Sequence, residues 1–322
     1  MITVERVAEL RTICDTARRD GARVGFVPTM GYFHEGHRSL MRAARAANDL
    51  VVVSLFVNPT QFGPNEDLGR YPRDPEGDAT AAEREGVDVL FVPSVAEMYP
   101  EGSCTTVHVE GLTAGLCGAS RPDHFDGVTT VVAKLFAMVG PCRAYFGRKD
   151  AQQLAVIRRM TTDLALPVEV VGCPLVREPD GLAMSSRNAF LAGDDRQSAT
   201  VLAWALRAAG EAAVAGERDA GVLRRVVVDI LAASPAVRLD YAEVVDAHTL
   251  EPSATIGAHT LVAVAAFVGS TRLIDNIAIT VTPDAHGREV VTVDTGVITP
   301  AFTDPTFAHP PLAAAAAEVA IP

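Results

Sequence analysis

Two histidines, His34 and His37, form the clearest chemical signal in the sequence. They lie in the segment Pro28–His37, between a run that we predict as a strand and one that we predict as a helix. Gly31 permits a tight turn, and Gly36 permits a close approach of the backbone to a phosphate. Free N–H groups at a helix start favour anions, and imidazoles can donate to phosphate oxygens. The pattern predicts a triphosphate site that stabilises charge as pyrophosphate leaves; the alternative is two incidental surface histidines.

A second segment, Phe146–Gln153, repeats the order of strand end, glycine and helix. It contains Lys149, one of only two lysines in a chain whose other basic residues are all arginine. The compact ammonium could meet ATP phosphates, and Asp150 could accept from a ribose hydroxyl or bind a metal. Gln153 could bind a substrate hydroxyl or carboxylate. An exposed helix start would explain Asp150 alone, but it leaves Gly147 and Lys149 unexplained.

A third segment, Asp180–Asn188, combines small residues with Ser185, Ser186 and the fixed cation of Arg187. Such a loop could close over phosphates. The alternative interpretation is an ordinary helix cap, because serine and asparagine are common at helix starts.

Two further features are weaker. Asn58 and Gln61 follow a strongly apolar run, where a polar substrate would be recognised, although ordinary turn chemistry also uses such residues. Lys134, the second lysine, is either a surface residue whose stem lies along apolar neighbours or a cation that faces the site, and we favour the surface interpretation.

The composition restricts the partners. The chain has 322 residues, a formal net charge of -12 and 48% hydrophobic residues. Because an acidic protein repels phosphate polymers, we expect small molecules rather than nucleic acid or anionic membranes. No apolar run approaches the roughly 20 residues of a membrane span, and no export signal is visible. The cysteines show no metal-like spacing, which favours a reducing, cytoplasmic setting; they are Cys14, Cys104, Cys117, Cys142 and Cys173.

The elements that position these residues read as parallel α/β units in the first half of the chain, because apolar runs alternate there with amphipathic stretches. Leu50–Val57 is continuously apolar and β-branched, so we expect it near the centre of the sheet. The predicted strands are Gly25–Pro28 as the first, Leu50–Val57, Val87–Val92, Ala144–Phe146 and Val168–Val171, and the predicted helices are His37–Ala47, Ala79–Glu85, Phe125–Val139 and Ala151–Leu164.

The second half indicates a smaller α+β domain. Its predicted helices are Ala199–Ala215 and Gly221–Ala233, and its predicted strands are Leu239–Val245, Leu261–Val268, Ile274–Thr280 and Glu289–Val297. We place the domains at 1–175 and 176–283, followed by an extension, 284–322, that we expect to be partly flexible. The final fifteen or so residues should be loosely ordered, because termini without apolar patterning seldom dock.

The combined segments resemble the pantothenate synthetase (pantoate–beta-alanine ligase) family, from about residue 1 to 282. The matching motifs are Pro28–His37, Ser54–Phe62, Tyr71–Arg73, His124–Val128, Phe146–Met160, Arg177–Asn188 and Thr271–Asn276. The resemblance implies a Rossmann-like parallel-sheet domain that binds the nucleotide, followed by a lid domain, in a homodimer. It implies Mg²⁺-dependent adenylation of (R)-pantoate by ATP with release of pyrophosphate, then attack by beta-alanine to give pantothenate and AMP.

The resemblance also implies roles for single residues. His37 is expected to donate a proton with His34 beside it, and Gln61 and Gln153 to bind pantoate. The segments expected to bind ATP are Met30–His37, Gly147–Asp150, Val176 and Met184–Arg187.

Four positions depart from the family pattern: Phe33, Arg148, Ala151 and Phe267. They leave open a related adenylating ligase or nucleotidylyltransferase that joins a different acid and amine. A synthetase that acts on tRNA is disfavoured by the acidic charge and by the lack of a basic domain. A silent ATP or metabolite sensor is disfavoured because a sensor need not keep His34, His37, Lys149 and Arg187.

Overall fold

The computed structural model describes residues 1–64, 66–299 and 319–320, and it divides the chain into two compact units. Unit 1 comprises Met1–Ala114, Arg121–Arg148 and Gln152–Cys173. Unit 2 comprises Gly115–Ser120, Lys149–Ala151 and the chain from Pro174 onward. No helix among the described residues is long and apolar enough to cross a membrane.

Unit 1 contains a six-stranded parallel sheet with the strand order β1-β4-β3-β2-β5-β6. Its strands are β1 (Ile2–Val4), β2 (Val24–Thr29), β3 (Leu50–Leu55), β4 (Val89–Phe91), β5 (Cys142–Gly147) and β6 (Val168–Cys173). The order reverses between β2 and β5, which is the place where open α/β sheets bind ligands beyond the carboxyl ends of the strands. The segments that follow β2, β3 and β5 carry the predicted site residues between Met30 and Gln153.

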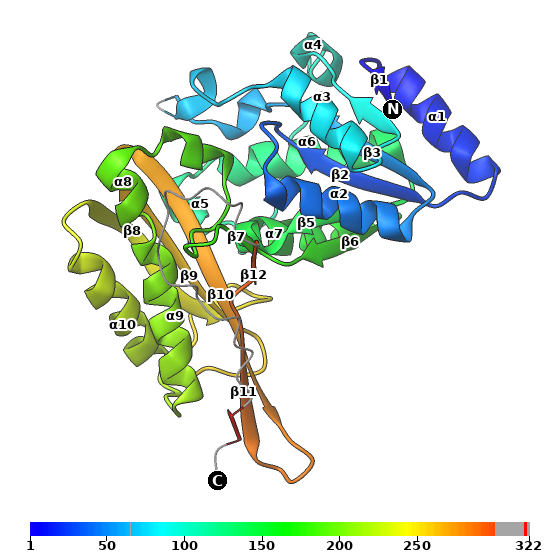
Figure 1. Cartoon of the computed structure of the whole chain (residues 1–322). Helices are drawn as coiled ribbons and strands as arrows, with labels where there is room; N and C mark the ends of the chain where they lie inside the picture. The colour runs from blue at the N-terminus through cyan, green and yellow to red at the C-terminus, as the bar shows by residue number, and fades with distance from the viewer. Residues whose placement is uncertain (65, 300–318, 321–322) are drawn as a thin grey trace. The chain divides into compact units, whose positions relative to one another are not determined.

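Helices cover both faces of this sheet (Figure 1). The helices along this part of the chain are α1 (Val7–Arg19), α2 (Glu35–Ala47), α3 (Pro75–Arg84), α4 (Val95–Met98), α6 (His124–Val139) and α7 (Ala151–Asp163), with short 3₁₀ helices η1 (Pro59–Gln61), η2 (Asp67–Gly69) and η3 (Arg148–Asp150). Successive strand residues face opposite sides. Val27 packs with Met41 of α2, whereas Phe26 meets Phe136 of α6 at 6.5 Å between ring centroids.

The central position predicted for Leu50–Val57 is confirmed, because β3 lies between β2 and β4 inside the sheet. The prediction that Gly25–Pro28 belongs to the first strand is wrong, since β1 and α1 precede it. The three-residue β1 lies at the sheet edge and is too short to give a periodic signal.

Unit 2 is built on an antiparallel sheet with the order β13-β11-β10-β9-β8. The strands are β8 (Val237–Asp246), β9 (Thr260–Val268), β10 (Thr271–Pro283), β11 (Glu289–Asp294) and β13 (Val319–Ala320), and the helices are α5 (Cys117–Ser120), α8 (Gly193–Ser198), α9 (Val201–Val214), α10 (Ala220–Ala232) and the 3₁₀ helix η4 (Ser186–Phe190). Leu206 of α9 and Leu223 of α10 are fully buried against alternate residues of β9, such as Val264.

Two strands outside that sheet pair in parallel: β7 (Val176–Arg177) and β12 (Val297–Ile298). The predicted single strand Glu289–Val297 is therefore wrong in one respect, because it is divided between β11 and β12. Gly296 interrupts it with a φ of 85°, which is incompatible with an extended strand. The expectation about the final fifteen or so residues falls, apart from Val319–Ala320, on residues outside those that the structure describes.

Candidate active site

The two histidines lie together at the start of α2, as the sequence predicts. His34 is the N-cap residue, and its Nδ1 accepts from the Gly36 amide at 3.1 Å. The His34 amide in turn donates to Nδ1 of His37 at 3.4 Å, and the ring centroids are 4.1 Å apart. Because both Nδ1 atoms accept, each neutral imidazole carries its proton on Nε2. The cap therefore orients two Nε2–H donors at the positive end of a helix.

The turn that precedes these histidines depends on Asp78, which the sequence did not single out. Its buried carboxylate accepts from the amides of Tyr32 at 2.8 Å and Phe33 at 2.6 Å. Burial raises the pKa of Asp78, although these two amides oppose the shift. An ionised Asp78 therefore costs folding free energy at neutral pH. It stabilises a backbone in which Gly31 has a φ of 85° and Tyr32 a φ of 55°.

Asn58 and Gln61 are joined in one network beyond the end of β3. Nδ2 of Asn58 donates to Oε1 of Gln61 at 3.2 Å, and Nε2 of Gln61 lies 3.2 Å from Sδ of Met30. Asn58 is almost fully buried, and its Oδ1 accepts from the hydroxyl of Tyr99 at 2.8 Å. Burial raises the pKa of Tyr99, so its hydroxyl keeps its proton and donates. The predicted residues Met30, Asn58 and Gln61 are thus brought together in unit 1.

Lys134 is half-buried and contacts the same network, and its surface interpretation stays a prediction. Its ammonium lies 5.4 Å from the centroid of the Tyr99 ring, a cation–π arrangement. Helix α6, which carries Lys134, also approaches the Gln61 segment closely. A β-carbon at Gly127 would lie 2.4 Å from the carbonyl oxygen of Thr60. No local pattern indicates either contact, because the residues involved are far apart in the sequence.

Two consecutive glutamines in the first turn of α7 have different surroundings. Nε2 of Gln152 donates to the Leu112 carbonyl at 3.0 Å, and Gln152 is buried. Gln153, the predicted pantoate ligand, is half-buried in the next position. Arg148 lies close enough to Arg158 for its charge, together with the larger effect of burial, to lower the pKa of Arg158. Unit 1 therefore concentrates positive charge after Gly147.

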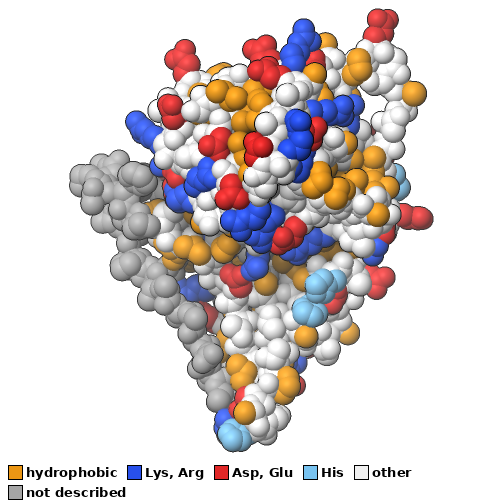
Figure 2. All heavy atoms as spheres, turned by 90° about the vertical axis from the view of Figure 1, so that its right-hand side faces the viewer, with side chains coloured by type: hydrophobic (Ala, Val, Ile, Leu, Met, Phe, Trp, Pro, Cys, Tyr) orange, Lys and Arg blue, Asp and Glu red, His pale blue; other side chains and the backbone are white. Residues whose placement is uncertain are grey.

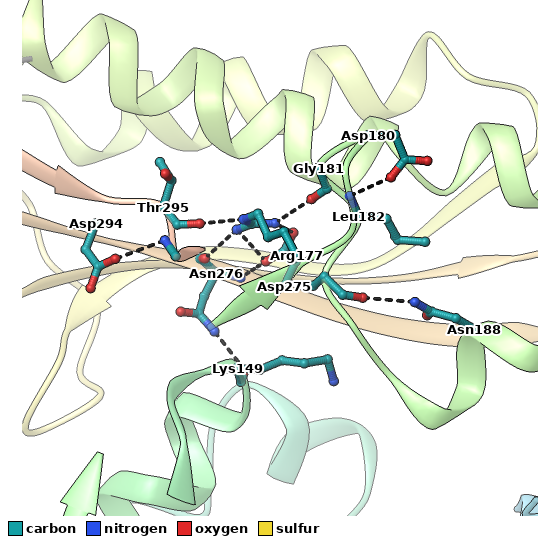
Figure 3. A network of polar contacts seen from close by, with 12 residues as sticks. Lys149, Arg177, Asp180, Gly181, Leu182, Asn188, Asp275, Asn276, Asp294 and Thr295 are labelled. Atoms are coloured by element: carbon teal, nitrogen blue, oxygen red, sulfur yellow. Dashed lines mark hydrogen bonds and ion pairs between the residues drawn. The ribbon is translucent and has the colours of Figure 1, made fainter. Parts of the chain in front are cut away.

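In unit 2, the turn at Lys149 is held through its backbone. The Lys149 carbonyl accepts from Nδ2 of Asn276 at 2.8 Å, while the side chain extends away from this contact (Figure 3). Asp150 follows in the last position of η3 and is half-buried. This contact fixes the backbone from which the Lys149 side chain extends, and it does not involve the ammonium group.

A buried ion pair lies beside that turn. The Arg177 guanidinium meets both carboxylate oxygens of Asp275, at 2.7 and 3.0 Å, and the two residues are 5% and 3% exposed (Figure 3). Arg177 also bonds the carbonyls of Gly181 at 2.9 Å and Asn276 at 3.3 Å. The sequence signal was available, because a carboxylate inside the apolar strand Leu273–Ile279 must be paired when buried.

The predicted phosphate loop, Asp180–Asn188, follows Arg177 closely in the chain. Val176, the predicted adenine residue, accepts from the Met184 amide at 2.9 Å. Ser185 caps η4 and accepts from the Arg187 amide at 3.2 Å, so the capping interpretation holds for Ser185. Ser186 is buried and Arg187 is half-buried. The structure therefore places Val176, Met184 and the Ser-Ser-Arg residues on one short hairpin and turn.

Acidic and basic side chains are interspersed over the face seen in Figure 2, with no extended basic stripe among the described residues of that face. Groups of three or more His, Cys, Asp or Glu that could hold a metal ion are absent from the described part of the chain.

Comparison with known proteins decides the family. The family model for pantoate-beta-alanine ligase matches residues 2–278. The chain belongs to this family. A pantothenate synthetase from Heliobacterium modesticaldum is 56% identical over 281 residues, which is 87% of this chain and 100% of that protein. One from Caldicellulosiruptor saccharolyticus is 53% identical over the same length and the same shares.

Solved pantoate-beta-alanine ligases have the same fold. A pantothenate synthetase from Thermus thermophilus, 52% identical, superposes with a TM-score of 0.81 over 86% of this chain and 98% of its own. A pantoate-beta-alanine ligase from Francisella tularensis, complexed with beta-gamma ATP and beta-alanine, is 33% identical with a TM-score of 0.71 over 86% and 97%. The predicted family, the α/β fold class and the ligase function are confirmed.

Two departures from the pattern of pantoate-beta-alanine ligases have structural partners. Phe33 packs against the ring of His37 at 5.5 Å between centroids. Phe267 lies 4.0 Å from the guanidinium carbon of Arg238 on the neighbouring strand β8. The Phe267 ring therefore makes a cation–π contact with Arg238.

Proposed function

We propose that this chain condenses (R)-pantoate with beta-alanine through a pantoyl adenylate. The pantoate carboxylate attacks the α-phosphorus of ATP and pyrophosphate leaves; the beta-alanine amine then attacks the acyl carbon and AMP leaves. The observation that carries this proposal is the histidine pair at the start of α2, where both Nδ1 atoms accept from backbone amides and so leave Nε2 as the donor. Such donors stabilise the negative charge that develops on the departing pyrophosphate.

In unit 1, we assign the phosphates to His34 and His37, with His37 as the proton donor. The backbone of Met30, Gly31 and Gly36 would approach ATP at the turn that Asp78 holds. Gln61, Gln153 and Asn58 would bind pantoate, because amides can both donate to its carboxylate and accept from its hydroxyls. Gln61 would also lie where beta-alanine approaches.

Residues at the end of β5 and in unit 2 would complete the nucleotide contacts. We assign phosphate binding to Lys149 and to the side chains of Ser185, Ser186 and Arg187. The remaining contacts, to ribose and adenine, are assigned to Gly147, Asp150, Val176 and Met184. With a net charge of -12, the chain must attract the triphosphate through these local donors rather than through its overall field.

The cation, assembly and location are also proposals. Mg²⁺ would arrive bound to the triphosphate, whose oxygens it prefers together with water. The homodimer follows from the family resemblance. A cytoplasmic location is supported by the five cysteines, all of which are free thiols. The division into domains 1–175 and 176–283 with the extension 284–322 likewise stays a prediction.

A product assay tests the reaction. ATP, (R)-pantoate and beta-alanine together should yield AMP, pyrophosphate and pantothenate, and leaving out beta-alanine should still allow a stoichiometric burst of pyrophosphate. The control is a panel of other hydroxy acids and amines. Formation of ADP, or turnover with another pair but none with this one, would contradict the assignment.

A further inference from the structure

The C-terminal extension starts beyond the family model, which ends at residue 278. A turn at Gly287 returns the chain, and β11 runs antiparallel along β10 from Glu289, opposite Pro283, to Asp294, opposite Ala278. Val291 of β11 is 1% exposed in the core of unit 2. The extension is therefore folded into unit 2 and ends its hairpin beside the residues that follow Asp275.

The next residues of the extension pair with β7. The Val297 amide donates to the Leu175 carbonyl at 2.7 Å. The Thr299 amide and hydroxyl both donate to the Arg177 carbonyl, at 3.0 and 3.1 Å. This pairing supplies main-chain partners to the strand that contains Val176, immediately before the predicted phosphate loop.

The extension also completes the hydrogen bonds of the buried Arg177 side chain. Its two terminal nitrogens bond Asp275, Gly181 and Asn276. Its Nε–H donates to the carbonyl of Thr295, which belongs to the extension (Figure 3). A buried N–H without an acceptor costs about 1–3 kcal/mol, and more when the group is charged. The guanidinium geometry thus depends on a segment that lies outside the family model.

Arg177 connects this segment to both predicted phosphate contacts of unit 2. Through the Gly181 carbonyl it holds the hairpin that leads to Ser185 and Arg187. Through Asp275 and Asn276 it holds the strand whose Asn276 side chain binds the Lys149 carbonyl. A displacement of Arg177 would therefore move both the Lys149 turn and the 180–188 loop.

We propose that residues 295–299 are a positioning element for the nucleotide, which fixes Arg177 and through it the Lys149 turn and the 180–188 loop. This inference rests on the proposed function, because it takes Lys149 and Arg187 as phosphate contacts. It assigns the extension to binding of a nucleoside triphosphate and not to binding of the acid, whose predicted ligands lie in unit 1.

Gly296 offers a specific way to displace the segment. Besides its φ of 85°, a β-carbon on Gly296 would lie 2.4 Å from the Leu175 carbonyl oxygen. Gly287, in the same extension, has a similar φ of 77°, but a β-carbon added there would have nothing within 4 Å. Gly296→Ala and Gly287→Ala therefore carry comparable backbone strain, while only the first pushes the extension away from β7.

The experiment compares these two variants in the full-length chain. Gly296→Ala should raise the KM for ATP about tenfold, the effect of weakening one hydrogen bond to a charged group, with the KM for pantoate within twofold of wild type. Hydrogen exchange should accelerate at the amides of 176–188 and stay unchanged in β2 and β3. Gly287→Ala should change neither the KM for ATP nor the exchange at 176–188. If Gly296→Ala does not fold, Thr299→Val, which removes only the hydroxyl contact, should give the same pattern at a smaller amplitude.

An unchanged KM for ATP with unchanged exchange at 176–188 would overturn the inference and leave the proposed reaction intact. Equal rises in the KM for ATP and for pantoate would also overturn it, because they would indicate a general structural defect. If the wild-type protein forms no pantothenate, the reaction fails, yet equilibrium binding of ATP to the same variants still tests the extension. Equal ATP affinity of wild type and Gly296→Ala would then contradict the role of residues 295–299 in nucleotide binding.

Discussion

The candidate site residues of unit 1 and those of unit 2 are held by different kinds of contact. In unit 1, the functional side chains make the bonds themselves: the rings of His34 and His37 accept from backbone amides of one helix cap, and the side chain of Asn58 bonds that of Gln61. In unit 2, other residues bind the backbone of the site segments. Asn276 bonds the Lys149 carbonyl, and Arg177 bonds the Gly181 carbonyl of the 180–188 loop. Both unit 2 contacts depend on one buried ion pair.

The two kinds of contact differ in how they link function to stability. A substitution in the unit 1 network should change chemistry or substrate binding while costing little folding free energy. A substitution in the unit 2 ion pair should cost folding free energy first, because it leaves a charge buried without a partner. Three predictions test that distinction.

The largest expected effect is on stability. Asp275→Ala leaves the Arg177 guanidinium buried without its carboxylate, so the free energy of unfolding should fall by about 3–5 kcal/mol, measured by urea denaturation. The control is Asp163→Ala, which breaks the exposed pair with Arg159 and should cost less than about 0.5 kcal/mol. A loss below about 1 kcal/mol for Asp275→Ala would mean that this ion pair contributes no more than an exposed one. The proposed difference between unit 1 and unit 2 would then be wrong.

The next effect is on chemistry in unit 1. His37→Ala removes a phosphate donor, so pyrophosphate release with ATP and pantoate should slow by about 10²–10³-fold. The free energy of unfolding should fall by only about 1 kcal/mol, the loss of part of a helix cap. His248→Ala, at an exposed histidine of unit 2, is the control and should keep the wild-type rate. Pyrophosphate release within twofold of wild type would refute the role of His37.

The smallest effect should come from Tyr99→Phe. The variant keeps the ring beneath Lys134 but loses the hydroxyl that donates to Asn58. The KM for pantoate should rise about fivefold, which corresponds to about 1 kcal/mol for one hydrogen bond, and the KM for ATP should not change. Lys134→Gln should act in the same direction and more weakly, by about 0.5 kcal/mol. A change in the KM for ATP alone would contradict the role of this network in unit 1.

Much of unit 1 could be predicted because local patterns encode it. Apolar runs marked β2, β3 and β5, and the glycine and histidine spacing marked the start of α2. Since ligands bind beyond strand ends in parallel sheets, those patterns also located the candidate site. The short edge strand β1 was missed because three residues show no periodicity.

The contacts that hold the site were not predictable in the same way. Asp78 lies 46 positions from the Tyr32 amide that it binds, and Arg177 lies 98 positions from Asp275. Each is an ordinary charged residue in its own segment, and only the fold brings its partner near. The same holds for the extension. From the sequence, Gly296 only interrupts a strand, and its close approach to Leu175 is visible only in the fold.

Residue types at short spacing were enough to predict the family, the class of fold and a set of candidate nucleotide ligands. Tertiary structure alone decided which residues hold them: Asp78 beneath the histidine turn, Tyr99 with Lys134 behind Asn58, and Arg177 between Asp275 and Thr295. The physical reason is that a buried polar group needs a partner, and the chain can supply that partner from any distance along its length.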